Sequence, residues 1–208
     1  MGKLFISEHP LMKHKITMLR DKNTSTKEFK ELISEVAMLL KYEATRELPT
    51  VETTVQTPIA EAKCSKIKQD IVIVPILRAG LGMVDGVHNI LPAAKVGHIG
   101  LYRDPETLTP VEYYCKVPKD LENTKVFVLD PMLATGKTAE AAVEFLKERG
   151  AKDVTVICVL AAPDGVKTVQ STFEDVDIYA AAYDTMLNEK GYIVPGLGDA
   201  GDRMFGTK

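Results

Sequence analysis

Short apolar runs rich in β-branched residues recur from residue 70 onward, and they constrain the fold more than any other feature. They are IVIVPIL (71–77), KVGHIGLY (95–102), KVFVLD (125–130), VTVICVLAA (154–162) and DIYAAAY (177–183). Near-continuous apolar runs of this length are typical of parallel strands covered on both faces. A helical pattern at 138–149, stopped by Gly150, lies between two of them. The sequence therefore predicts an α/β fold, a parallel sheet flanked by helices.

Three segments depart from this alternation. Residues 26–48 carry apolar side chains at helical spacing, which predicts an amphipathic helix entered through Thr26. Residues 103–118 place turn signals around a short strand at 111–115, which predicts a projecting hairpin arm. The glycine-rich segment 191–208 predicts an irregular loop. Because no repeat or linker interrupts the 208 residues, one domain covering 1–208 is expected.

Charge and composition argue against several classes of function. A net charge of -3 and a pI near 5.9 disfavour a protein that binds nucleic acid or an anionic membrane surface. No segment approaches the roughly 18 apolar residues of a membrane-spanning helix, and the N-terminus lacks a signal-peptide core. Cys64, Cys115 and Cys158 lie too far apart to suggest a disulfide framework or a zinc site. A cytoplasmic location is expected.

The motif ATGKT at 134–138 suggests a phosphate-binding loop between an apolar run and a helix. A nucleotide triphosphatase or kinase loop needs glycine at position 131, but Pro131 stands there, which fixes φ and removes a donor. Free N–H groups at a helix N-terminus still attract an anion. Asp130 beside them suits hydroxyl groups rather than bare phosphate. A ribose with a 5′-phosphate supplies both groups.

Four stretches resemble the type I phosphoribosyltransferases, in particular the uracil phosphoribosyltransferase family. They are VLDPMLATGKT (128–138), PILRAGLGMVDG (75–86), GLYRDPETLTPVEYYCKVP (100–118) and GYIVPGLGDAGDRMFGTK (191–208). The resemblance spans essentially the whole chain. It implies that uracil and phosphoribosyl pyrophosphate (PRPP) react to give UMP and diphosphate in pyrimidine salvage, with Mg²⁺ as cofactor. It further implies a small hood built from N- and C-terminal segments, a homodimer or higher homo-oligomer, and, in some members, a GTP effector.

Two positions depart from the usual type I loop. Asp130 is followed by Pro131 instead of a second acid, which narrows the resemblance to the uracil branch. Lys137 stands where relatives often have glycine. Its side chain either contacts the 5′-phosphate or points to solvent, and the second is favoured because the backbone already provides donors.

The resemblance assigns PRPP to two arginines and to the loop. Arg78 and Arg103 match diphosphate-binding arginines, and guanidinium groups suit phosphate oxygens. The competing interpretation of each is a salt bridge to acids of the fold. The loop residues implied are Asp130, Pro131, Met132, Leu133, Ala134, Thr135, Gly136, Lys137 and Thr138. Asp130 would bind the ribose hydroxyls, and the hydroxyls of Thr135 and Thr138 the 5′-phosphate. Thr138 is also a candidate N-cap.

The resemblance assigns the base to the C-terminal segment. Residues matching Ile193, Gly198, Asp199 and Ala200 bind uracil, and Tyr192 either walls the pocket or packs in the core. Asp199 also contacts PRPP, and Mg²⁺ is expected mainly through PRPP and water. The catalytic residues implied are Asp199, Arg103 and Asp130. The rival from another class is an RNA-binding regulator on the same scaffold, which the acidic pI disfavours.

Overall fold

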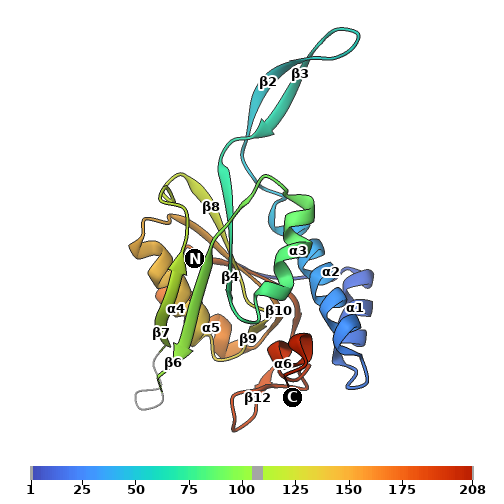
Figure 1. The fold of residues 1–208 in the computed structure, drawn as a ribbon, viewed down its shortest axis with the longest axis vertical. Coiled ribbons are helices and arrows are strands. Elements are labelled where there is room, and N and C mark those ends of the chain that lie inside the picture. Colours follow the sequence, from blue (N-terminus) through green and yellow to red (C-terminus); the bar gives the residue numbers. More distant parts are fainter. Residues whose placement is uncertain (1, 105–109, 208) are drawn as a thin grey trace.

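A mostly parallel sheet lies between two helical layers in this computed structural model, which describes residues 2–104 and 110–207 (Figure 1). Its strands are β1 Leu4–Ile6, β4 Asp70–Leu77, β5 Lys95–Val96, β6 His98–Arg103, β7 Pro110–Lys116, β8 Thr124–Leu129, β9 Met132–Leu133, β10 Asp153–Ala161 and β11 Asp177–Tyr183. The helices are α1 Pro10–Arg20, α2 Thr26–Ala44, α3 Leu81–Ile90, α4 Lys137–Glu148, α5 Pro163–Thr172 and α6 Ala200–Phe205. The strand order is β1-β11-β10-β8-β4-β6-β7, with β5 beside β4 and β9 beside β10.

All five apolar runs form strands of this sheet, which confirms the predicted fold class. Alternate side chains of each strand enter two different cores. Ile71 and Ile73 of β4 pack under α1, α2 and α3, whereas Val72 and Val74 pack under α4 and α5. Because both faces are buried, a strand here needs apolar residues at nearly every position.

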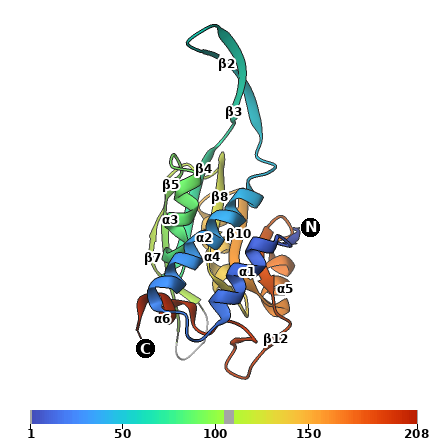
Figure 2. The ribbon, with the colours of Figure 1, turned by 90° about the vertical axis from the view of Figure 1, so that its right-hand side faces the viewer.

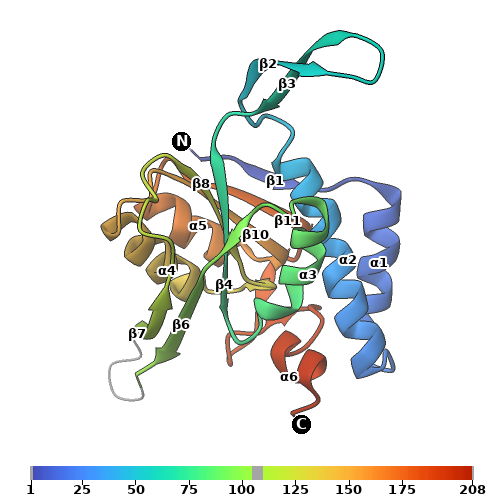
Figure 3. The same ribbon diagram turned by 45° about the horizontal axis from the view of Figure 1, so that its top comes forward.

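The helices divide between the two faces of the sheet (Figures 1 and 3). Helix α2 begins at Thr26 as predicted, and the Ser25 side chain accepts a hydrogen bond from the N–H of Glu28. It ends at Ala44, before the predicted 48. Helix α4 begins at Lys137 with Gly136 as its N-cap, so the interpretation of Thr138 as the N-cap is wrong. None of the described helices has the length and apolar character needed to cross a membrane.

A free-standing hairpin of β2 Thr50–Gln56 and β3 Glu61–Ile67 extends away from the body (Figures 1 and 2). The sequence predicts the arm at 103–118 instead. There β6 and β7 do form a hairpin, but it continues the main sheet, and residues 105–109 lie outside the described structure. The β2–β3 arm escapes prediction because most of its side chains are polar and exposed, so no apolar stripe marks it.

The C-terminal segment is more regular than predicted. It contains β13 Ile193–Val194, which pairs with β12 Met186–Leu187, and the short helix α6. Met204 of α6 is buried against the start of α3, where a Cβ on Gly82 would lie 2.2 Å from its Sδ atom. Helix α6 also packs against α2. N- and C-terminal segments thus meet beside the carboxyl edge of the sheet, in the position expected of a hood (Figure 2).

Candidate active site

Arg78 and Asp130 leave two neighbouring strands, β4 and β8, at the same edge of the sheet. The register pairs Pro75 with Leu129, so the two strands end at nearly the same height along the sheet. A Cβ on Gly80 would lie 2.4 Å from the carbonyl oxygen of Leu129, so the turn after β4 packs directly on the end of β8. The Leu77–Arg78 peptide bond is cis. In doubly wound sheets this is the edge at which ligands bind.

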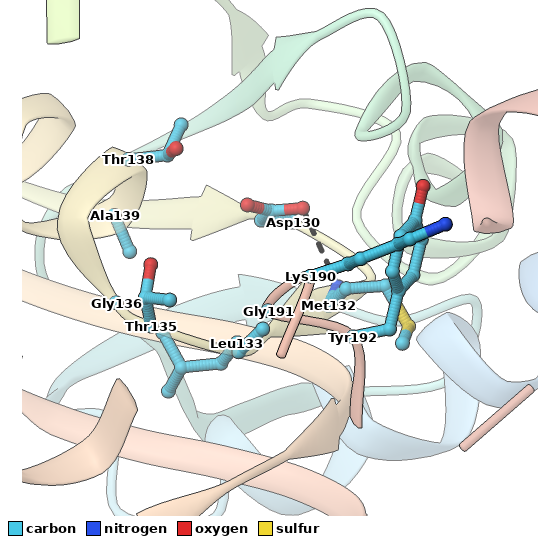
Figure 4. Close-up of a pocket in the computed structure, with 11 residues that line it drawn as sticks. Asp130, Met132, Leu133, Thr135, Gly136, Thr138, Ala139, Lys190, Gly191 and Tyr192 are labelled. Carbon is cyan, nitrogen blue, oxygen red and sulfur yellow. Dashed lines mark hydrogen bonds between the residues drawn. The ribbon is translucent and has the colours of Figure 1, made fainter. Parts of the chain in front are cut away.

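A cavity of about 210 Å³ opens at this edge (Figure 4). It is lined by Asp130, Met132, Leu133, Ala134, Thr135, Gly136, Thr138, Ala139, Lys190, Gly191 and Tyr192. The structure therefore brings together seven of the nine predicted loop residues. The other two do not line it: Pro131 is buried, and Lys137 lies on the outer side of α4. A volume below the ~300–1,000 Å³ of typical ligand pockets is in keeping with a sugar phosphate.

Gly136 sets the shape of the loop. Its φ of 79° is left-handed, and a Cβ there would lie 2.6 Å from the carbonyl oxygen of Gly165, at the start of α5. Only glycine fits both demands. The loop thus rests on α5 and directs the free N–H groups of the first turn of α4 to the cavity, where the hydroxyls of Thr135 and Thr138 also lie (Figure 4).

The Asp130 carboxyl is an unusual acid. Burial raises its pKa to about 6, and a weak hydrogen bond from the backbone N–H of Met132 (3.4 Å) offsets only part of this effect. Within the described residues, no cation pairs with it. A carboxylate with open acceptor positions beside an anion site suits the hydroxyls of a ribose.

The Lys137 ammonium lies 3.1 Å from the carboxylate of Glu140, one turn along α4. Its side chain is 58% exposed. This geometry favours the solvent-facing interpretation, and the backbone of the loop remains the source of phosphate donors.

Lys190 is a cavity residue that the sequence does not predict. It lies between β12 and β13, where the side chain of Asn188 accepts hydrogen bonds from the N–H groups of Lys190 and Tyr192 (3.0 Å each). A Cβ on Gly191 would lie 3.8 Å from Thr135, so this turn borders the phosphate loop. Figure 4 shows Lys190 and Tyr192 across the cavity from Thr138. The available signal was a basic residue just before the GYIVPGLGDAG motif.

Replacing Lys190 by methionine is expected to raise KM for PRPP about 5- to 10-fold with little change in kcat, since an exposed cation that lines the cavity is lost. Initial-rate kinetics with varied PRPP would measure this. Lys137→Met is the matched control, and we expect its KM to stay within about threefold of the parent value. A larger effect at Lys137 than at Lys190 would contradict both placements.

The structure describes the side chain of Arg78 but not that of Arg103. The Arg78 guanidinium lies 3.8 Å from Asp202 and is 60% exposed. Such a surface ion pair is weak, so the salt bridge to Asp202 leaves the Arg78 guanidinium able to bind another anion. Arg103 ends β6, but its side chain lies outside the described structure, and its role stays a prediction.

Of the predicted base-binding residues, Gly198, Asp199 and Ala200 lie where the chain turns into α6. Ile193 lies apart from them, buried in β13. The Asp199 side chain caps this helix by accepting a hydrogen bond from the N–H of Asp202 (2.9 Å). Within residues 2–104 and 110–207, the N–H groups of Gly198 and Ala200 have no acceptor. A Cβ on Gly201 would contact both Asp199 and Ala79, so this turn lies beside the Arg78 turn. The residues predicted to bind the base therefore lie beside Arg78, which is predicted to bind the diphosphate.

The fold defines a class of protein. The solved structure of adenine phosphoribosyl transferase from Trypanosoma brucei shares it with a TM-score of 0.60 over 92% of this chain and 88% of that chain, at 14% identity. The chain therefore has the type I phosphoribosyltransferase fold, with a cavity at the carboxyl edge of its sheet.

The family model for uracil phosphoribosyltransferase matches residues 6–207, and the chain belongs to that family. Uracil phosphoribosyltransferases of Bacillus cytotoxicus and Geobacillus kaustophilus are 60% and 58% identical over the full length of both chains. The solved structure of the AQ2163 protein from Aquifex aeolicus is 39% identical and covers 97% of each chain with a TM-score of 0.92. The predicted family is confirmed.

Proposed function

We propose that the protein is a pentosyltransferase that converts uracil and PRPP to UMP and diphosphate in pyrimidine salvage. One observation carries the proposal: in a member of this family, the Asp130 carboxyl lies beside the loop at the N-terminus of α4, in a single cavity. This pairing matches a ribose that carries a 5′-phosphate.

The loop would fix the ribose while the diphosphate leaves. N–H groups of the first turn of α4 and the Thr135 and Thr138 hydroxyls bind the 5′-phosphate, and Asp130 binds the ribose hydroxyls. The anomeric carbon becomes oxocarbenium-like as its bond to diphosphate breaks, so stabilising the departing charge is the main task. Arg78 and Arg103 supply that stabilisation.

The α6 turn would orient the base for attack. Uracil presents acceptor, donor and acceptor along one edge, and the N–H groups of Gly198 and Ala200 suit its acceptors, with Ile193 beside them. Cytosine reverses two of these positions and would leave buried groups unpaired. One oxygen of Asp199 caps α6. The other would contact the diphosphate side or the ring N–H.

The chemistry of the donor set fits the Mg²⁺ that the family implies. Among the described residues no cluster of three or more His, Cys, Asp or Glu side chains could hold a metal ion. Asp199 and Asp130 offer single carboxylates, which suits a cation that arrives with PRPP and keeps most of its water. When bound, Mg²⁺ would neutralise charge on the diphosphate.

We also propose a homodimer or higher homo-oligomer. The β2–β3 arm stands clear of the body (Figure 1), and Ile59 at its tip is 95% exposed, which is typical of a surface that a partner covers. We further propose a GTP effector, which the resemblance implies for some members of the family, and a cytoplasmic location, which the three separated cysteines favour.

The proposal is tested by incubating the purified protein with uracil, PRPP and Mg²⁺ and measuring UMP. We expect UMP with uracil and none with cytosine. Asp199→Asn should lower kcat about 10- to 100-fold while keeping the α6 cap, because asparagine caps as well as aspartate but lacks the charge. Phosphate release from ATP, or RNA binding without UMP formation, would instead favour one of the rival functions.

A further inference from the structure

One ion pair binds both the N–H and the carbonyl of Gly196, inside the segment proposed to read the base. Asp184 follows β11, and its Oδ2 accepts a hydrogen bond from the Gly196 N–H (2.9 Å). Arg20, the last residue of α1, donates from Nη1 and Nη2 to the two oxygens of Asp184 (2.6 and 2.7 Å). Arg20 Nη1 also donates to the carbonyl oxygen of Gly196 (2.8 Å). We call Arg20 and Asp184 the Gly196 clamp.

The clamp is sheltered and charged. The side chain of Asp184 is 8% exposed and that of Arg20 is 26% exposed. Burial by itself would raise the pKa of Asp184, but hydrogen bonds from Arg20 and from the Gly196 N–H outweigh it, so the pKa lies below its ordinary value. A sheltered, bidentate guanidinium–carboxylate pair holds geometry better than a surface ion pair.

Position 196 cannot hold any residue other than glycine. Its φ is 64°, and a Cβ would lie 2.1 Å from the carbonyl oxygen of Ile193. The turn 193–196 is therefore closed tightly on itself, and fixing Gly196 fixes the direction in which Gly198 and Asp199 follow.

A second arginine holds the next peptide. Arg203 Nη1 donates to the carbonyl oxygens of Leu197 (2.7 Å) and Leu19 (2.5 Å), and Nη2 donates to that of Asp21 (2.6 Å). Two consecutive carbonyls of the segment are thus tied to the end of α1 and the residue after it. Within the described residues, the N–H groups of Gly198 and Ala200 are among the backbone groups of this segment that have no hydrogen-bond partner and stay open to a ligand.

We propose that Arg20 and Asp184 are positioning residues for base recognition, a role that rests on the proposed function. They touch no substrate. They hold the Gly196 peptide so that the N–H groups of Gly198 and Ala200 stand where the carbonyl oxygens of uracil arrive. The phosphate loop and Arg78 lie on other elements, so the clamp acts on PRPP only through Asp199 and should affect its binding much less than that of uracil.

Arg20→Lys and Asp184→Asn test this separation. A lysine is a single point charge and cannot bridge the Asp184 oxygens and the Gly196 carbonyl together. We expect KM for uracil to rise about 10-fold or more in both variants, with kcat and KM for PRPP within about threefold, because small misplacement of a binding group costs this much. The rise in KM for uracil should be larger in Asp184→Ala than in Asp184→Asn, since asparagine keeps an acceptor for the Gly196 N–H.

Glu35→Gln is the matched control. Glu35 forms an ion pair of 2.5 Å with Lys15 of α1 that lies away from the base segment, so neither KM should change. Hydrogen exchange adds a readout independent of turnover: residues 193–199 should exchange faster in the clamp variants and at the parent rate in Glu35→Gln.

The outcomes separate the two proposals. An active parent protein whose folded clamp variants keep the parent KM for uracil would overturn the clamp alone, as would equal rises in KM for uracil and PRPP. A parent protein that makes no UMP would overturn the proposed function and the clamp's role with it. If Asp184→Ala fails to fold, Arg20→Lys still decides the matter by its KM values.

Discussion

Asp130→Asn is expected to lower kcat/KM for PRPP about 100-fold or more, because two charge-assisted hydrogen bonds to ribose hydroxyls are each worth ~1.5–3 kcal/mol. The same substitution is expected to raise the thermal unfolding temperature at pH 7.5. Loss of activity and gain of stability in one variant would show that the protein carries this acid for function.

The pH dependence follows from the raised pKa of Asp130. Its pKa is about 6 in the folded protein against 3.8 ordinarily, because the carboxyl is buried. Between these values the folded state binds the proton more tightly, so the contribution of Asp130 to stability falls as pH rises and stays lowest above pH 6. The gain from Asp130→Asn should therefore reach on the order of 1–3 kcal/mol near neutral pH and shrink toward pH 4.

The matched control is Glu144→Gln, on the exposed side of α4. It removes an acid close to the loop without touching the cavity, so activity and stability should both stay near the parent values. Urea unfolding at pH 4.5, 6 and 7.5 measures the stability profile. If the Asp130→Asn protein is less stable than the parent at pH 7.5, the conclusion that this carboxyl is buried without a cation partner is refuted.

Lys41→Met is expected to stabilise the protein by on the order of 2–4 kcal/mol at pH 7.5. Lys41 is fully buried on the inner side of α2, and within the described residues its Nζ has no hydrogen-bond partner. The Nζ atom lies 2.5 Å from the centre of the Phe127 ring. Burial, and secondarily the charge of Lys125, lower the pKa of Lys41 from 10.5 to about 5. Methionine has similar length and no charge to desolvate.

The sign of the pH effect is opposite to that at Asp130. Between pH 5 and 10.5 the unfolded chain binds a proton at Lys41 that the folded protein does not, so parent stability rises with pH across this window. The advantage of Lys41→Met should accordingly shrink as pH approaches 10. Lys30→Met, on the exposed side of the same helix, should change stability by less than about 0.5 kcal/mol. A Lys41→Met protein that is less stable than the parent would refute the conclusion that Lys41 is buried and neutral.

The sequence predicts those parts of the molecule in which local pattern and tertiary burial agree. The runs at 71–77 and 125–130 are strands because both faces are covered, and the loop at 130–138 lines a cavity because it joins a buried strand to a helix at the carboxyl edge of the sheet. The positions of α2 and α4 follow from apolar periodicity, with errors of at most four residues at their ends.

The features that the sequence misses depend on distant partners. Arg20 and Asp184 are 164 residues apart, and neither carries a local pattern that indicates the other. Lys190 reaches the phosphate cavity only because the β12–β13 turn lies on Thr135. The β2–β3 arm, which has almost no buried side chain, lacks the periodicity on which a prediction depends.

The pairing of β1 with β11 has a consequence for how the chain is made. Leu4 to Ile6 pair with Ile178 to Ala180, so the first strand to leave the ribosome waits for one of the last. At ~5–20 residues per second, this delay is about 10–35 s. During synthesis β4, β6 and β7 emerge before β8, β10 and β11, and the edge formed by β11 stays open until the N-terminal strand docks. The amino-terminal residues therefore close a structure that the rest of the chain has already built.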